Sequence, residues 1–225
     1  MRLLVARKSR MTFSIVAADP ATDEVGCAVQ SKYFAIGAVT PWVRAGVGAV
    51  ATQAMGVVAR NGERTLAALA LNVDPTVALE EALADDSDRE LRQLGAVAAD
   101  GRAAAFTGRD CVEWAGHLTE QGFAVQGNML ANADVLPAMR RAFLDGVAPL
   151  PERMMAALEA AQAAGGDRRG QQAAALVVEQ LGAAGRSREG IDRVCDLRVD
   201  DHPEPIVELR RLLTLWRRRQ AERHP

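Results

Sequence analysis

Residues 11–18 of the chain read Met-Thr-Phe-Ser-Ile-Val-Ala-Ala, and this stretch decides the fold that the sequence predicts. From residue 13 onward the run is apolar and favours a strand, and the turn-forming residues 19–23 follow it directly. Residues 25–30 form a second run of the same kind. The two runs therefore predict a β-hairpin, and the Met11-Thr12 dipeptide stands immediately ahead of its first strand.

Beyond this hairpin, groups of strands alternate with pairs of helices. Asn61-Gly62 is typical of a turn, Asp74-Pro75 of a helix start, and Pro41 of a bulge or an edge position within its strand. This order of elements favours an α+β protein with largely antiparallel sheets. The expected elements are strands over 36–44 and 46–53, helices over 63–71 and 75–83, strands over 94–99, 102–107 and 123–126, helices over 134–143 and 151–164, a strand or short helix over 172–178, a short strand over 196–199 and a helix over 205–219.

The composition is that of a globular domain, because 49% of the 225 residues are apolar and 25% are charged. A net charge of −2 excludes the global basic field that binds nucleic acid or anionic membranes. The three cysteines include no Cys-x-x-Cys pair, which excludes a zinc ribbon and argues against a disulfide framework. No apolar run approaches the roughly 20 residues of a membrane span. We therefore expect a cytoplasmic protein that binds neither nucleic acid nor a membrane.

Thr12 carries the chemistry that we expect of this chain. A threonine that begins a mature chain has a free α-amine with a pKa of about 7.7–8.0, and this amine can take the proton of the threonine's own hydroxyl. One residue then supplies both the nucleophile and the base for attack on a carbonyl. The Met11-Thr12 bond is also of the kind that methionine aminopeptidase cleaves. The alternative interpretation is an interior methionine followed by a strand-forming threonine.

The sequence contains six unusual blocks, at residues 11–17, 25–32, 40–54, 126–130 (Gln-Gly-Asn-Met-Leu), 165–171 (Gly-Gly-Asp-Arg-Arg-Gly-Gln) and 196–203. Together they extend over nearly the whole chain. They resemble domain of unknown function 1028, a bacterial and archaeal family that is placed in the N-terminal-nucleophile (Ntn) hydrolase superfamily. The resemblance implies a four-layer αββα sandwich that hydrolyses an amide bond in a small or peptide-like substrate, without a metal or an organic cofactor. Cell-wall peptides are candidate substrates, because some relatives carry a domain thought to bind peptidoglycan.

Several residues are candidates for assisting Thr12. A nearby cation would lower the pKa values of the amine and the hydroxyl, and Arg44 is the first candidate for this role and Lys32 the second. The oxyanion needs N–H donors, which we expect from the side chain of Asn128 and from backbone amides of residues 53–56. Substrate binding is assigned to Gln53, Gln126, Asp167 and Arg168. A guanidinium among them would bind a substrate carboxylate. Each candidate also has a structural interpretation, as a strand end, a turn or a solvated loop.

The family pattern places the threonine directly after the initiator methionine, whereas this chain carries an extension at residues 1–11. A miscalled start is the favoured explanation and a propeptide the second. If the extension stays attached, the Thr12 nitrogen is an amide without basicity and the mechanism fails. Residues 12–202 are expected to form the Ntn domain, and residues 203–225 a helical appendage. Flat helical outer layers also make a homodimer the expected assembly.

Two other functions remain open. One is a ligand-binding protein that keeps the sandwich without catalysis, and the other is an enzyme that uses Cys27 or Ser31 as its nucleophile. The intact mass separates the first from the Thr12 enzyme, because only the enzyme requires a chain that begins at Thr12. A Thr12→Ala variant separates the second, because it keeps activity only if another residue attacks the substrate.

Overall fold

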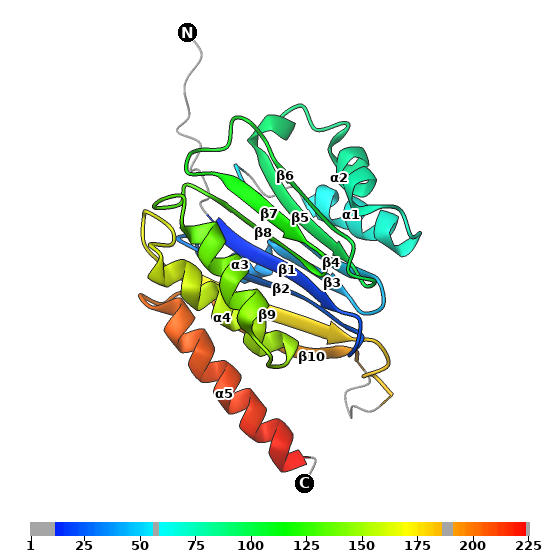
Figure 1. Ribbon diagram of the computed structural model, residues 1–225, viewed down its shortest axis with the longest axis vertical. Coiled ribbons are helices and arrows are strands. Elements are labelled where there is room, and N and C mark those ends of the chain that lie inside the picture. Colours follow the sequence, from blue (N-terminus) through cyan, green and yellow to red (C-terminus); the bar gives the residue numbers. More distant parts are fainter. Residues whose placement is uncertain (1–11, 56–58, 186–190, 224–225) are drawn as a thin grey trace.

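The computed structural model describes residues 12–55, 59–185 and 191–223 (Figure 1). Within these ranges the chain forms ten strands in two sheets and five α-helices. Every strand pair in both sheets is antiparallel. The predicted mixed α+β class with largely antiparallel sheets is therefore confirmed. The extension at residues 1–11 lies outside the described residues.

The six-stranded sheet has the order β10-β9-β2-β1-β8-β7, so the strand that begins at Thr12 lies in its interior. Its strands are β1 (Thr12–Asp19), β2 (Glu24–Ser31), β7 (Gly116–Glu120), β8 (Phe123–Asn128), β9 (Ala173–Gln180) and β10 (Arg193–Val199). The predicted hairpin is formed by β1 and β2. The register places Thr12 opposite Ser31 on one side and opposite Asn128 on the other.

The four-stranded sheet has the order β3-β4-β5-β6. Its strands are β3 (Pro41–Arg44), β4 (Gly48–Ala54), β5 (Arg92–Ala98) and β6 (Ala103–Thr107). Pro41 lies in an edge strand, where its missing N–H costs no hydrogen bond between strands. Of the two predicted positions, a bulge or an edge, the edge is therefore confirmed.

The helices cover the outer faces of the two sheets (Figure 1). Helices α1 (Ala59–Ala70) and α2 (Pro75–Leu83) pack on the four-stranded sheet. Helices α3 (Val135–Asp145), α4 (Leu150–Ala163) and α5 (Pro205–Arg223) pack on the six-stranded sheet. Ile206, Leu209 and Leu213 of α5 are buried in the same core as α4, so this helix is an integral part of that layer.

The inner faces of the two sheets pack against each other, and the alternation along β1 shows how the two sides differ. Phe13 and Ile15 face the helices, whereas Val16 faces the second sheet. The core between the sheets is built from small side chains, mostly alanine and valine. Small residues allow the sheets to approach closely. At the Thr12 end of this layer, polar side chains replace them.

Two local predictions were wrong. Residues 36–44 do not form one strand: Ile36–Ala38 is a 3-10 helix, and β3 begins at Pro41. Ala35 adopts a left-handed conformation with φ of 53°, which turns the chain so that Ile36 is buried against β2 and β9. The predicted turn at Asn61-Gly62 lies inside α1. The glycine serves packing instead of a turn, because a Cβ at Gly62 would lie only 2.5 Å from Trp42 Nε1.

Candidate active site

Thr12 is fully buried at the end of an interior strand. Its hydroxyl donates a hydrogen bond to Ser31 Oγ at 3.2 Å. Its backbone carbonyl accepts a hydrogen bond from Gln53 Nε2 at 3.3 Å, across the gap between the two sheets. The residue is therefore held at both its side chain and its backbone, which is the precision that a reacting group needs.

Buried amide and hydroxyl groups fill the space between the sheets behind Thr12. Ser14 Oγ donates to Gln53 Oε1 at 2.6 Å and accepts from Gln126 Nε2 at 2.6 Å. Both glutamines are buried inside the sandwich, at 2% and 0% exposure respectively. The structure therefore brings Gln53 and Gln126 to Thr12 from behind, where they contact strand groups of the protein itself.

Gln93 of β5 is at the centre of this network, and the sequence analysis did not identify it. Its Oε1 accepts from Gln53 Nε2 at 2.8 Å and from Asn128 Nδ2 at 2.9 Å. Its Nε2 donates to Thr107 Oγ1 at 2.9 Å and to the carbonyl of Gly127 at 2.8 Å. Because acceptors surround its nitrogen and donors its oxygen, the carboxamide has one stable orientation. The sequence signal for it is a glutamine that directly precedes the apolar run at residues 94–99.

Asn128 is brought to Thr12 by the pairing of β8 with β1. A carboxamide nitrogen carries two N–H groups, and Asn128 uses one of them on Gln93 Oε1. Within the described residues its second N–H has no acceptor, and a bound group can take that place. Thr107 also bonds to His117 Nδ1 at 2.8 Å, which connects the network to the exposed strand β7.

The loop at residues 165–171 closes the same end of the sheet. Asp167 is buried and accepts hydrogen bonds from the backbone N–H groups of Lys32 and Arg169, at 3.0 and 2.9 Å. It also forms an ion pair with the Arg169 guanidinium at 3.1 Å. Asp167 therefore anchors the chain directly after Ser31, and its carboxylate is occupied by the protein. Arg168 is exposed on this loop, and its N–H donates to the carbonyl of Met129.

Lys32 lies at the Thr12 end, but Arg44 does not. The Lys32 ammonium donates to the carbonyl of Gln171 at 2.9 Å. Arg44 pairs with Gly48 at the start of β4, whereas Gln53, which contacts Thr12, lies five residues farther along that strand. At about 3.4 Å per residue, this places Arg44 about 17 Å from the Gln53 position. The reason is that β3 runs antiparallel to β4, so the end of β3 points away from Thr12.

The two alternative nucleophiles occupy different environments. Ser31 Oγ is in hydrogen-bond contact with Thr12. Cys27 is fully buried between the sheets, and desolvation by that burial raises the pKa of its thiol well above the ordinary value. A thiol that resists ionisation is a poor nucleophile.

An ion pair supports the sheet edge near Gln53. Arg92 Nε donates to Asp86 Oδ2 at 2.8 Å, and both side chains are at most 10% exposed. The Arg92 guanidinium also donates to the carbonyl of Met55, just after β4. The hydrogen bond from Arg92, assisted by one from Asn61 Nδ2, lowers the pKa of Asp86 to about 2. The pair therefore connects the starts of α1 and β5 to the end of the strand that carries Gln53.

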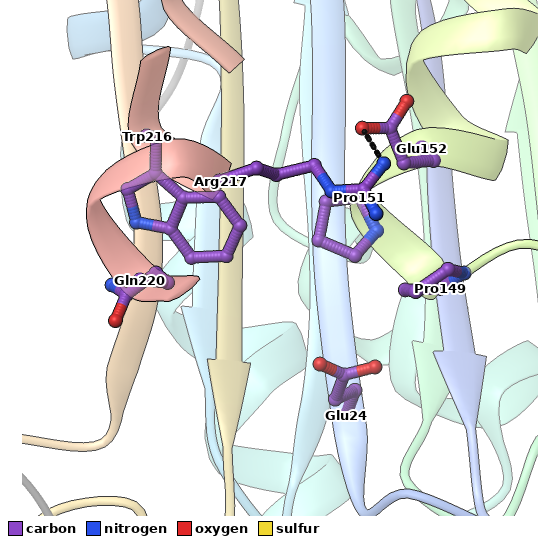
Figure 2. A pocket seen from close by; sticks show the side chains of 7 residues that line it. All are labelled: Glu24, Pro149, Pro151, Glu152, Trp216, Arg217 and Gln220. Atoms are coloured by element: carbon purple, nitrogen blue, oxygen red, sulfur yellow. Dashed lines mark hydrogen bonds and ion pairs between the residues drawn. The ribbon is translucent and has the colours of Figure 1, made fainter. Parts of the chain in front are cut away.

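A pocket of about 180 Å³ lies at the other end of the six-stranded sheet (Figure 2). It lies between Trp216 and Arg217 of α5, Pro151 and Glu152 of α4, and Glu24 at the start of β2. The Arg217 guanidinium forms an ion pair with Glu152 at 3.0 Å across it. Glu24 pairs with Asp19, seven residues along β1 from Thr12, so this pocket does not belong to the Thr12 site.

The comparisons with known proteins agree with this fold. The family model of DUF1028, described as a family of unknown function, matches residues 12–209. The chain belongs to this family, as its sequence blocks predicted. The crystal structure of protein SPO2555 from Silicibacter pomeroyi, described as DUF1028, is 33% identical, with a TM-score of 0.82 over 91% of this chain and 85% of that chain. None of the curated proteins matches the chain. No α-helix within the described ranges is long and apolar enough to cross a bilayer.

Proposed function

We propose that this protein is an Ntn-type amidohydrolase whose nucleophile is Thr12. The observation that carries the proposal is the position of Thr12, whose hydroxyl bonds to Ser31, while Asn128 stands opposite it with one N–H that has no acceptor among the described residues. The match of the family model begins at this same residue. Two stacked sheets with helices on their outer faces also support assignment to the four-layer αββα arrangement of Ntn hydrolases.

In the proposed reaction, the free α-amine of Thr12 takes the proton of the Thr12 hydroxyl as the oxygen attacks the substrate carbonyl. The second N–H of Asn128 stabilises the oxyanion that forms. The amine then gives its proton to the departing nitrogen, which leaves an ester on Thr12. Water hydrolyses this ester with the same amine as base. The substrate is a small amide or a peptide-like compound, and neither a metal nor an organic cofactor takes part in these steps.

The alternative is a ligand-binding protein without catalysis. One observation favours it, because Met11 precedes Thr12 in the chain, and an amide nitrogen at Thr12 cannot act as a base. The two functions therefore differ in whether the peptide bond between Met11 and Thr12 is intact or cleaved.

The test compares the full chain with a chain expressed from Met11, which keeps every described helix and strand. Intact mass shows whether Met11 has been removed. Each protein is then incubated with an N-acylserine β-lactone, which acylates a nucleophilic hydroxyl and adds its own mass. We expect one adduct on Thr12 in the processed chain, and a labelling rate that rises with pH through about 7.7–8.0 as the amine loses its proton.

The variants assign the adduct to a residue. Thr12→Ala abolishes labelling if Thr12 attacks, and Ser31→Ala leaves the adduct on Thr12. Labelling that persists in Thr12→Ala but disappears in Ser31→Ala would assign the nucleophile to Ser31. A processed chain that is never acylated, and that hydrolyses no compound in a panel of amides, lactams and muropeptides, would support the binding protein.

A further inference from the structure

Backbone groups that cannot change their role impose the orientation of the Gln93 carboxamide. Its Nε2 lies 2.8 Å from the carbonyl oxygen of Gly127 and 3.0 Å from that of Gly116. A carbonyl oxygen only accepts hydrogen bonds, so the end of the side chain that meets these two oxygens must be the nitrogen. The two glycines are partners in the pairing of β7 with β8, which fixes where their carbonyls lie. Gln93 Oε1 is therefore left as an acceptor at the other end of the carboxamide.

This acceptor determines which end of the Asn128 side chain meets it. Asn128 Nδ2 donates to Gln93 Oε1 at 2.9 Å, whereas an Asn128 oxygen in that place would be repelled. Since both N–H groups belong to the same nitrogen, the second one stays on the side of the carboxamide that is turned away from its carbonyl oxygen. Whether Asn128 offers a bound group a donor or an acceptor thus follows from Gln93.

The same oxygen is connected to the candidate nucleophile through Gln53. Gln53 Nε2 donates to Gln93 Oε1 at 2.8 Å and to the backbone carbonyl of Thr12 at 3.3 Å. The other end of Gln53 is held as well, because its Oε1 accepts from the Ser14 hydroxyl at 2.6 Å. Gln93 Oε1 is therefore one hydrogen bond from Asn128 and two from Thr12, and it relates the positions of these two residues.

Burial makes this arrangement strict. Gln93 is 0% exposed, and Gln53 and Asn128 are each 2% exposed. Hydrogen bonds are strong in such a medium, and polar groups left without a partner there are costly. A reversed Gln93 carboxamide would set its oxygen against two carbonyl oxygens and its nitrogen against two amide nitrogens. The buried network therefore admits one set of orientations.

We infer that Gln93 is a positioning residue of the Thr12 site, which holds Asn128 so that an N–H group meets the oxygen of the substrate carbonyl. This inference rests on the proposed function, because Asn128 serves as an oxyanion donor only if Thr12 attacks a carbonyl. Gln93 bonds to no reacting atom and acts through Asn128. Loss of one oxyanion donor typically lowers kcat about 10²–10³-fold, so a misoriented Asn128 should lose a large part of that factor.

The first experiment observes the Asn128 side chain without any reaction. The chain expressed from Met11 is labelled with ¹⁵N-asparagine, and Asn128→Ala identifies the side-chain signals of that residue. In Gln93→Leu we expect the Asn128 side-chain protons to exchange with D₂O at least about tenfold faster, since their acceptor is gone. Asn61, whose Nδ2 donates to Asp86 Oδ2 at 3.0 Å, is the internal control for general opening of the fold. Exchange at Asn128 that is no faster than in the parent chain would overturn the inference.

The second experiment is a double-mutant cycle on the acylation of Thr12 by the β-lactone. We expect Gln93→Leu to slow acylation at least about tenfold in the parent chain, but less than about twofold in a chain that already carries Asn128→Ala. An equal loss in both backgrounds would show that Gln93 does not act through Asn128, and the inference would be wrong. Gln30→Leu is the matched control, because this buried glutamine has no hydrogen-bond partner among the described residues.

Gln93→Glu keeps the test decisive if Gln93→Leu does not fold. Burial raises the pKa of a carboxyl group, so the new side chain stays protonated, donates to the Gly127 carbonyl and still accepts from Asn128. We expect this variant to keep the slow exchange at Asn128 and an acylation rate within about threefold of the parent rate. Faster exchange at Asn128 would overturn the inference. If the parent chain is never acylated, the proposed function fails, and the exchange measurement still decides whether Gln93 orients Asn128.

Discussion

Two buried glutamines of the same sandwich are predicted to respond oppositely to replacement by leucine. Gln93 accepts hydrogen bonds from Gln53 and Asn128 and donates to Thr107 and Gly127. Gln30 of β2 is also fully buried, but within the described residues neither polar atom of its carboxamide has a hydrogen-bond partner. Leucine is close to glutamine in size, so the two substitutions differ mainly in the hydrogen bonds that they remove.

The magnitudes follow from those bonds. Gln93→Leu removes the acceptor of the Asn128 amide and the donor to Thr107 and Gly127, while Gln53 Nε2 loses its shortest acceptor but keeps the Thr12 carbonyl. Each buried polar group left without a partner costs about 1–3 kcal/mol. We therefore expect a loss of about 4 kcal/mol in the free energy of unfolding. Gln30→Leu removes no hydrogen bond and replaces a desolvated amide with an apolar group, so we expect a gain of about 1 kcal/mol.

Urea unfolding at neutral pH measures both effects, provided that the dependence of the free energy on urea concentration keeps the same slope in each variant. The reasoning is wrong if Gln93→Leu costs no more than Gln30→Leu. A large loss on Gln30→Leu would also contradict it, because it would mean that the amide of Gln30 is satisfied within the core. The acylation rate at Thr12 should fall in Gln93→Leu and stay unchanged in Gln30→Leu.

Two further outcomes are expected from unfolding experiments. Gly95→Ala should lower the free energy of unfolding by about 1–3 kcal/mol, because the added Cβ would lie 2.1 Å from Gln126 Oε1. Gly116→Ala is the control, since the nearest atom to its added Cβ is 3.8 Å away. Equal urea midpoints for the two variants would contradict this prediction. Because Arg92 lowers the pKa of Asp86 to about 2, their ion pair stabilises the fold above pH 3.8 and is lost as the pH falls toward 2. This loss should amount to about 2 kcal/mol and be absent in Asp86→Asn; an unchanged pH profile in that variant would rule it out.

The local patterns of the sequence predicted the elements whose structure depends on neighbouring residues. The alternation that begins at Phe13 identified the first hairpin, and Asp74-Pro75 identified the start of α2, where the Asp74 side chain accepts from the N–H of Thr76. The ambiguous segment at residues 172–178 is strand β9, because it pairs with β2 and β10 on both sides. The pairing with β2 joins residues more than a hundred positions apart, so no local pattern contains it.

The candidate site was predictable only where strand register follows from a short turn. Thr12 and Ser31 meet because one hairpin joins their strands. Gln93 was missed since its partners Gln53 and Asn128 are 40 and 35 residues away and come from both sheets. Arg44 was chosen as a charge at a strand end, but which end faces Thr12 depends on how the two sheets stack, and that information is absent from the strand itself.

The position of α5 determines where the molecule can be modified. Its last turns lie beside Glu24, and Glu24 is about 24 Å from Thr12 along the strand at 3.4 Å per residue (Figures 1 and 2). A purification tag or a surface linker attached behind this helix therefore lies far from the proposed nucleophile. Under the proposed mechanism, the same tag fused ahead of Thr12 would replace the α-amine with a peptide bond, and an immobilised sample of this kind would be inactive for a chemical rather than a structural reason.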